Sequence, residues 1–168
     1  MKNKLRILSL GAGVQSTALA LMIAKGEVPM VDFCVFADTQ GEPDYIYEHL
    51  KWLQKQLPYK LIIASKGDLT DNCLRALSGE KKTKDGSSLS GSAIPFYIVK
   101  EDGKKGMGIR QCTVAYKIET IMKIVRAELG YKKYQRVKKD VNVEMLLGIS
   151  QDEVYRVKES RYHYVTHE

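Results

Sequence analysis

Short apolar runs and helical patterns alternate along the first half of the chain. The apolar runs at Leu5 to Leu10, Asp32 to Ala37 and Lys60 to Ala64 have the length and composition of buried strands. Between them, segments at about 16–25 and 44–57 repeat apolar residues at helical spacing. Because strands that alternate with helices are typical of parallel sheets, the sequence predicts an α/β fold with a parallel twisted sheet and helices on both faces.

The first two helices have clear sequence signals. The helix at about Ser16 to Lys25 is followed by Gly26, the residue type favoured just after a helix C-terminus. The helix at about 44–57 places one apolar face toward the sheet, made by Ile46, Leu50, Leu53 and Leu57. Both helices are therefore expected to cover the sheet.

The second half of the chain is less regular. A third helix is predicted at about Leu69 to Leu77, and the polar segment 78–92 is expected to be a mobile loop, with a lid over bound nucleotide as its functional interpretation. Residues 93–99 and 106–110 flank a turn-rich segment and predict a hairpin. A helix is expected near Val114 to Leu129, with an apolar face of Ile118, Ile121, Met122, Val125 and Leu129.

The end of the chain combines a strand with polar segments. A strand is predicted at Glu144 to Ile149, and Ser150 with Glu153 three residues later forms a capping-box pattern. The last residues are expected to be a poorly ordered tail. Lysines and tyrosines interleave at about 131–139, which indicates either a solvated linker or a surface for single-stranded nucleic acid.

Composition and charge limit the class of protein. With 168 residues, 44% hydrophobic and 28% charged, the chain is predicted to form a single globular domain, residues 1–168. Its formal charge of +7 favours anionic partners, although charge alone does not separate a nucleotide from a nucleic acid. No apolar run is long enough to cross a bilayer, and no signal-peptide pattern is found, so a cytoplasmic protein without membrane contact is expected.

The most informative stretch is the strand, small-residue turn and helix start at residues 7–21. This arrangement aims backbone N–H groups and a helix N-terminus at a phosphate. A Walker loop requires a lysine where Gln15 stands, which excludes that motif. A dinucleotide fingerprint finds its first two glycines in Gly11 and Gly13 and a candidate ribose-binding acid in Asp38, but Ser16 replaces the third glycine.

A third motif fits the loop better. Residues 11–17, Gly-Ala-Gly-Val-Gln-Ser-Thr, resemble the S-G-G-x-D-S-T pyrophosphate loop (PP-loop) of the adenine-nucleotide α-hydrolase-like superfamily. Gly11, Ala12 and Gln15 depart from that pattern, and Gln15 replaces an aspartate that helps to hold magnesium in ATP-cleaving members. The Gly-Val-Gln sequence resembles the phosphoadenosine phosphosulfate (sulfonucleotide) reductase family, including its short phage and bacterial relatives. Segments 36–42, 110–118 and 147–161 resemble that family's later segments in the same order.

The resemblance implies a site for an adenine nucleotide. Its substrate is expected to be phosphoadenosine phosphosulfate or ATP, with magnesium needed only for ATP, no other cofactor or metal, and a thioredoxin-like protein as reductant. The implied binding residues are Gly11, Ala12, Gly13, Val14, Gln15, Ser16, Thr17, Asp38, Thr39, Arg110, Lys117, Gly148, Arg156 and Arg161. Backbone N–H groups from Ala12 to Thr17 and the Ser16 hydroxyl are expected to hold the phosphate, and the arginines and Lys117 to neutralise its oxygens.

The three cysteines offer one candidate nucleophile. Reductases of this family use a cysteine on a C-terminal tail, whereas no cysteine follows Cys112 in this sequence, so either the chain is truncated or its activity differs. Cys112 is the candidate catalytic residue, with simple packing as the alternative, while Cys34 and Cys73 lie in apolar patterns expected to be core. An ATP-pyrophosphatase-type sulfurtransferase, a nucleic-acid-modifying enzyme, a non-catalytic nucleotide-binding or nucleic-acid-binding module and a nicotinamide-dependent oxidoreductase remain alternatives.

Overall fold

The first apolar run of the chain forms the central strand of a parallel sheet. In the computed structural model, β1 spans Lys4–Leu10 and lies in a five-stranded parallel sheet of order β3-β2-β1-β6-β7. The other strands of this sheet are β2 (Phe33–Asp38), β3 (Lys60–Ser65), β6 (Asn142–Leu147) and β7 (Val165–His167). The predicted α/β class with a parallel sheet is confirmed.

The strand order reverses beside β1. This strand pairs with β2 on one side and with β6 on the other, and Ser9 lies opposite Leu147. Because both pairings are parallel, β1 and β6 end at the same edge of the sheet, which we call the carboxyl edge. In open α/β sheets, ligands bind outside the carboxyl ends of the strands at the point where the strand order reverses.

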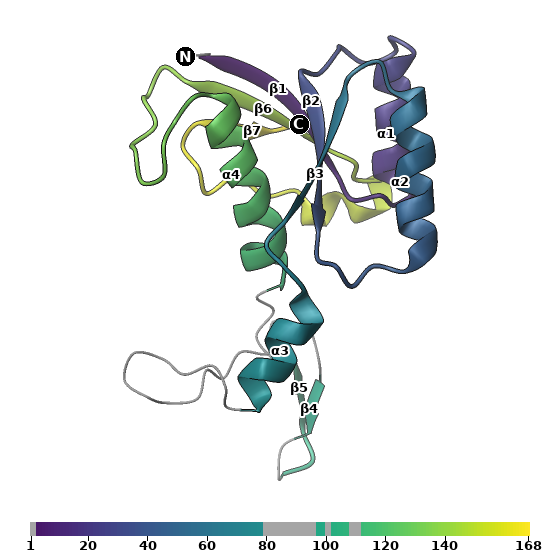
Figure 1. Cartoon of the computed structure of the whole chain (residues 1–168), viewed down its shortest axis with the longest axis vertical. Helices are drawn as coiled ribbons and strands as arrows, with labels where there is room; N and C mark the ends of the chain where they lie inside the picture. The colour runs from purple at the N-terminus through teal and green to yellow at the C-terminus, as the bar shows by residue number, and fades with distance from the viewer. Residues whose placement is uncertain (1–2, 79–96, 100–101, 108–111) are drawn as a thin grey trace. The chain divides into compact units, whose positions relative to one another are not determined.

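Helices cover both faces of the sheet. Helices α1 (Val14–Ala24) and α2 (Asp44–Gln56) lie together on one side, and α4 (Glu119–Glu128) lies on the other (Figure 1). On the first side, buried side chains of α1, α2 and the strands form one core cluster, which includes Leu8, Ala20, Ile23, Phe36, Leu50, Leu53 and Leu146. Val125 of α4 and Leu129 just after it are fully buried. The apolar faces predicted for α2 and α4 are therefore confirmed in their central positions.

Structure is described for residues 3–78, 97–99, 102–107 and 112–168. The chain divides into two compact units, and the single domain expected from the sequence stays a prediction. The first unit comprises residues 1–37, 43–64 and 121–168, and therefore carries the sheet with α1 and α2. The second comprises residues 38–42 and 65–120. Within the described residues, no helix is both long and apolar enough to cross a membrane.

The second unit contains the irregular segments of the sequence. Helix α3 spans Leu69–Leu77, and β4 (Tyr97–Val99) pairs antiparallel with β5 (Lys105–Met107), as expected for the predicted hairpin. The helix expected from Val114 begins earlier, as the π-helix η1 (Cys112–Ile118), before α4 continues it in α-helical form. The loop expected at 78–92 lies outside the described residues, except for Ser78.

The end of the chain differs from the prediction. The segment expected to be a poorly ordered tail contains β7, whose Val165 pairs with Val143 of β6. Ser150 is the N-cap residue of the 3₁₀-helix η2 (Gln151–Arg156), as the capping box predicts, but within the described structure its hydroxyl makes no capping hydrogen bond. The side chain of Val165 and that of the preceding Tyr164 are buried, which favours strand over tail.

Candidate phosphate-binding site

The loop between β1 and α1 presents the start of a helix to the surface. Gly13 is the N-cap residue, with φ −86° and ψ 178°, and its carbonyl oxygen accepts the first helical hydrogen bond from the Thr17 N–H at 3.0 Å. The N–H groups of the preceding helical residues point out of the helix end without partners inside it. Gly11, Gly13, Val14 and Gln15 are exposed. The geometry therefore offers N–H donors and a positive helix-dipole end to an anion.

The Ser16 side chain holds this loop together. Its Oγ accepts a hydrogen bond from the Gly11 N–H and donates one to the Gly13 carbonyl oxygen, each at 3.2 Å. The residue is buried, with 6% of its surface exposed. Ser16 was expected to bind phosphate through its hydroxyl, and that role stays a prediction. In the structure the hydroxyl fixes the turn that exposes the helix end.

Ala12 adopts a backbone conformation that favours glycine. Its φ is +56°, in the left-handed region, where the Cβ of an alanine approaches the following carbonyl oxygen at a cost of about 1 kcal/mol. The PP-loop pattern has a glycine at this position. The Ala12 methyl group is 6% exposed and belongs to the core cluster beside α1, so its burial offsets part of the strain.

Gly148 lies directly against the start of α1. A Cβ built on Gly148 falls 2.5 Å from the Ser16 backbone N and 2.7 Å from the Gln15 backbone C, so only a residue without a side chain fits. Gly148 follows the last residue of β6, which places it at the carboxyl edge beside residues 11–17, called the phosphate loop here after the ligand expected from the sequence. Gly148 was predicted as a binding residue from resemblance. The structure adds a physical reason for the glycine: close contact between β6 and α1.

A cavity of about 420 Å³ runs from the phosphate loop along the side of α1. Gln15 and Gly148 line it near the loop, and Ala18, Leu19 and Met22 line it farther along the helix. The volume lies within the range of small-molecule sites, about 300–1,000 Å³. Its lining is largely apolar, so it suits an uncharged part of a ligand better than a phosphate.

In the second unit, two predicted site residues meet at a third residue that sequence reasoning missed. Thr39 Oγ1 donates to Glu42 Oε1 at 3.2 Å, and Lys117 Nζ lies 3.6 Å from the same oxygen. Thr39 is buried and Lys117 is exposed. The signal that could have identified Glu42 was its place at the end of the segment 36–42, three residues after Thr39. Glu42 holds the two predicted residues together.

The turn that carries Thr39 has its own local support. Asp38 Oδ1 accepts a hydrogen bond from the Gln40 N–H at 2.7 Å, and the Thr39 carbonyl oxygen accepts one from the Leu69 N–H at 3.0 Å. Gln40 has a φ of +59°, a left-handed conformation that is uncommon for residues other than glycine. The Asp38 carboxylate, expected to approach a nucleoside, therefore stabilises the turn at the end of β2.

Three further anion-binding residues predicted from the sequence, Arg110, Arg156 and Arg161, stay predictions. Arg110 lies outside the described residues. Arg156 is the last residue of η2, which follows β6. Arg161 is exposed and precedes Tyr164, whose carbonyl oxygen accepts a hydrogen bond from Val143 at the beginning of β6.

The cysteines differ in burial. Cys34 in β2 is fully buried, and burial raises its pKa to about 12. Cys73 in α3 is 3% exposed and packs with Tyr116, Leu69 and Ala115. These two cysteines occupy core positions, as predicted. Cys112, at the beginning of η1, is partly exposed, and its Sγ lies 4.0 Å from Thr113 Oγ1.

This difference predicts that thiol reagents will modify the native protein selectively. At pH 8, Cys112 is expected to react with iodoacetamide at least about ten times faster than Cys34 or Cys73. The reagent reaches a buried thiol poorly, and apolar surroundings disfavour the thiolate, which is the reactive form. In urea, all three should react at similar rates. Mass spectrometry of tryptic peptides after timed alkylation measures each rate, and fast native labelling of Cys34 would contradict the burial described above.

In the part of the chain that the structure describes, no three His, Cys, Asp or Glu side chains form a group suited to a metal ion.

Comparisons of the chain with protein-family models, curated proteins and solved structures find no match. The candidate site therefore rests on its own geometry and on the resemblance of its sequence motifs.

Proposed function

We propose that this chain binds the phosphate or phosphosulfate group of an adenine nucleotide at the loop 11–17, and that it belongs to an enzyme of the sulfonucleotide reductase type. The observation that carries the proposal is the open N-terminus of α1 at the carboxyl edge, beside the reversal of strand order. Helix N-termini at such positions bind anions through their N–H groups. A cytoplasmic location fits such a function and is part of the proposal.

The loop favours this class over the two other nucleotide-binding motifs. Gln15 stands at the position where a Walker loop requires lysine, and Ser16 stands at the position where a dinucleotide fingerprint requires its third glycine. The buried Ser16 hydroxyl makes two hydrogen bonds that hold the loop together, and a glycine at this position could make neither. Gln15 also distinguishes the loop from ATP-cleaving PP-loops, because a neutral amide is a weaker magnesium ligand than a carboxylate.

Calorimetric titration tests the proposed ligand class. The chain is titrated separately with adenosine 5′-phosphosulfate, phosphoadenosine phosphosulfate, ATP, NADH and adenosine. The proposal predicts that a sulfonucleotide binds more tightly than NADH, and that adenosine binds weakly because it lacks the anionic group. Preference for NADH would favour the oxidoreductase alternative, and equal binding of adenosine would exclude phosphate recognition at the loop.

Binding of a sulfonucleotide is expected to be independent of magnesium. Because Gln15 stands where ATP-cleaving members carry a metal-binding aspartate, EDTA should change the sulfonucleotide affinity by less than about twofold. Restoring the carboxylate with Gln15→Asp should make binding respond to magnesium. The measurement is the same titration with EDTA and with excess magnesium. A large loss of wild-type sulfonucleotide affinity in EDTA would contradict the reductase-type assignment.

Lys117 provides a second test through its pairing with Glu42. If the Lys117 ammonium contacts the ligand's anionic group, Lys117→Ala should weaken sulfonucleotide binding about tenfold or more and leave adenosine nearly unchanged. Glu42→Gln removes the competing carboxylate and should leave sulfonucleotide affinity equal or higher. If both variants lose affinity equally, for the sulfonucleotide and for adenosine, the Lys117–Glu42 pair has a structural role only.

Reduction would require a thiolate that attacks the sulfur of the sulfonucleotide, so that the bond from sulfur to the phosphate oxygen breaks, the adenosine phosphate leaves and the cysteine carries a sulfonate group. A second thiol then attacks the sulfur of that cysteine and displaces sulfite, and the two thiols are oxidised to a disulfide. The partly exposed Cys112 is the candidate for the first thiol in this chain, and a thioredoxin-like protein for the second. Cys34 and Cys73 are too buried for either role. Sulfite release by wild type and Cys112→Ser, with thioredoxin supplied, tests this assignment, and release that persists in the variant would contradict it.

A further inference from the structure

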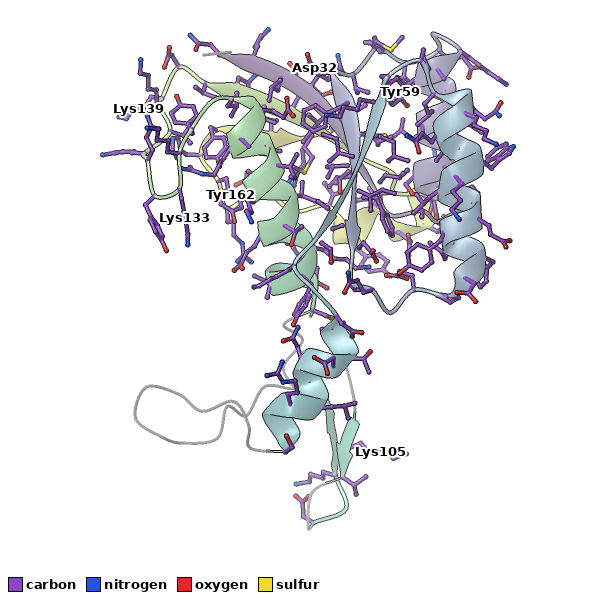
Figure 2. All side chains as sticks on the ribbon, viewed as in Figure 1. Asp32, Tyr59, Lys105, Lys133, Lys139 and Tyr162 are labelled. Carbon is purple, nitrogen blue, oxygen red and sulfur yellow. The ribbon has the colours of Figure 1, made fainter. Side chains whose placement is uncertain are left out.

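The segment between α4 and β6 carries a concentrated positive charge. We define the basic loop as residues 132–140. It contains five cations, Lys132, Lys133, Arg136, Lys138 and Lys139, and one acid, Asp140, and all six residues are exposed. The basic loop therefore has a net charge of +4, and the formal net charge of the whole chain is +7. Figure 2 shows Lys133 and Lys139 on this loop, with their side chains directed away from the ribbon.

The basic loop lies apart from the phosphate loop. It leads into β6, which begins at Asn142 and pairs there with Lys4, the first residue of β1. The basic loop thus lies at the edge where the strands begin, whereas Gly13 lies at the carboxyl edge (Figure 1). All of these residues belong to the first unit. A ligand of the basic loop is therefore distinct from a nucleotide at the start of α1.

Internal hydrogen bonds fix the conformation of the basic loop. The Arg126 guanidinium donates to the carbonyl oxygens of Lys132 and Gln135. The Gln135 side chain accepts from the Lys132 N–H at 3.0 Å, and the Gln135 N–H donates back to the Lys132 carbonyl oxygen at 3.2 Å. Later in the basic loop, the Val137 side chain is buried, with 3% of its surface exposed, and anchors the loop to the core. A loop held in this way loses little conformational entropy when a ligand binds.

Tyr134 is displayed at the surface of this ordered turn. The residue is 88% exposed and has a φ of +66°, a conformation that is rare and strained for an aromatic residue. The Lys133 Nζ lies 4.9 Å from the centroid of the Tyr134 ring. An exposed aromatic ring beside lysines is the arrangement that stacks an unpaired base while cations contact the neighbouring phosphates.

We propose that the basic loop binds single-stranded nucleic acid, with a base stacked on Tyr134 and phosphates held by the surrounding lysines. Several cations spread along the loop match a run of phosphates better than the single anionic group of a mononucleotide. A membrane surface fits less well, because insertion requires exposed aliphatic or Trp and Phe side chains, and the aliphatic residue of the basic loop, Val137, is buried.

Fluorescence anisotropy with a labelled 12-residue oligothymidylate tests this proposal on the full chain. Tyr134→Gly removes the ring and suits the positive φ, so the protein should stay folded while affinity falls about tenfold. Tyr134→Phe keeps the ring and should retain affinity. The double variant Lys132→Gln/Lys133→Gln should lower the slope of log affinity against log salt by about 0.7 for each lost phosphate contact.

A matched control removes two exposed lysines elsewhere. Lys51 and Lys55 lie on α2, and their double glutamine variant has the same net charge as the variant of the basic loop. It should bind the oligonucleotide like wild type. Equal losses in the two double variants, full affinity in Tyr134→Gly, displacement of the oligonucleotide by a saturating adenine nucleotide, or binding to phosphatidylserine vesicles without oligonucleotide binding would each overturn the proposal.

Discussion

Replacing Gly148 with alanine is expected to destabilise the first unit by about 2–3 kcal/mol, although it adds a single methyl group. The new Cβ would lie 2.5 Å from the Ser16 backbone N and 2.6 Å from the Ser16 Cα. These are backbone atoms, so no side-chain rotation relieves the overlap, and β6 must separate from the start of α1. The same displacement should move the phosphate loop and weaken sulfonucleotide binding.

Urea unfolding of Gly148→Ala, monitored by circular dichroism, measures the loss in the free energy of unfolding. Gly11→Ala is the matched control, because a Cβ at Gly11 meets its nearest atom, Ser16 Oγ, at an ordinary 3.7 Å. We expect Gly11→Ala to change stability by less than about 1 kcal/mol. Similar unfolding curves for both variants would show that β6 and α1 are not in the close contact described.

Gly13→Asp is expected to abolish sulfonucleotide binding while the protein stays folded. A Cβ at Gly13 has room, since its nearest contact is Gln15 Oε1 at 3.9 Å. The backbone of Gly13 is extended, and aspartate is a favoured N-cap residue, so stability should be maintained or raised. The carboxylate would occupy the N–H groups proposed for the phosphate and repel the ligand, lowering affinity about a hundredfold or more.

Gly13→Asn tests whether the loss of affinity in Gly13→Asp comes from the negative charge or from a side chain that occupies the N–H groups of the helix end. Asparagine is an equally good N-cap and has nearly the same shape, but it carries no charge. We expect Asn to weaken sulfonucleotide binding about tenfold, less than Asp, because its amide competes for the N–H groups without repelling the anion. Unfolding curves establish that both variants fold. Unchanged affinity in Gly13→Asp would remove the start of α1 from the binding site.

Much of the fold could be predicted because its signals are local. The run Leu5 to Leu10, the small residues after it and the helix that ends before Gly26 predict β1, the loop and α1, and Gly26 has the expected left-handed φ of +80°. The apolar face of α2 likewise predicts the burial of Leu50 and Leu53. Each prediction depends on residues within one or two turns of one another.

Features set by long-range contacts could not be predicted. The three-residue strand β7 is too short for a periodic signal, and it is stabilised by pairing with β6 and by burial of Tyr164. The π-helical turn of η1 has no distinct sequence pattern. The reason for glycine at 148 becomes visible only when β6 and the start of α1 are placed side by side. Glu42 was missed because one of its two partners, Lys117, is distant in the sequence and meets it only in the folded chain.

The central claim is that the N–H groups at the start of α1 bind the phosphate of an adenine nucleotide, and backbone amide NMR tests it most directly. In ¹H–¹⁵N spectra of the wild-type chain, adenosine 5′-phosphosulfate should shift the amide signals of Val14, Gln15 and Ser16 in a saturable manner. The Thr17 amide already donates to Gly13, so its signal should move less. Adenosine at the same concentration should leave these signals in place. Saturable binding of the phosphosulfate with the Val14 to Ser16 signals unchanged would contradict the account.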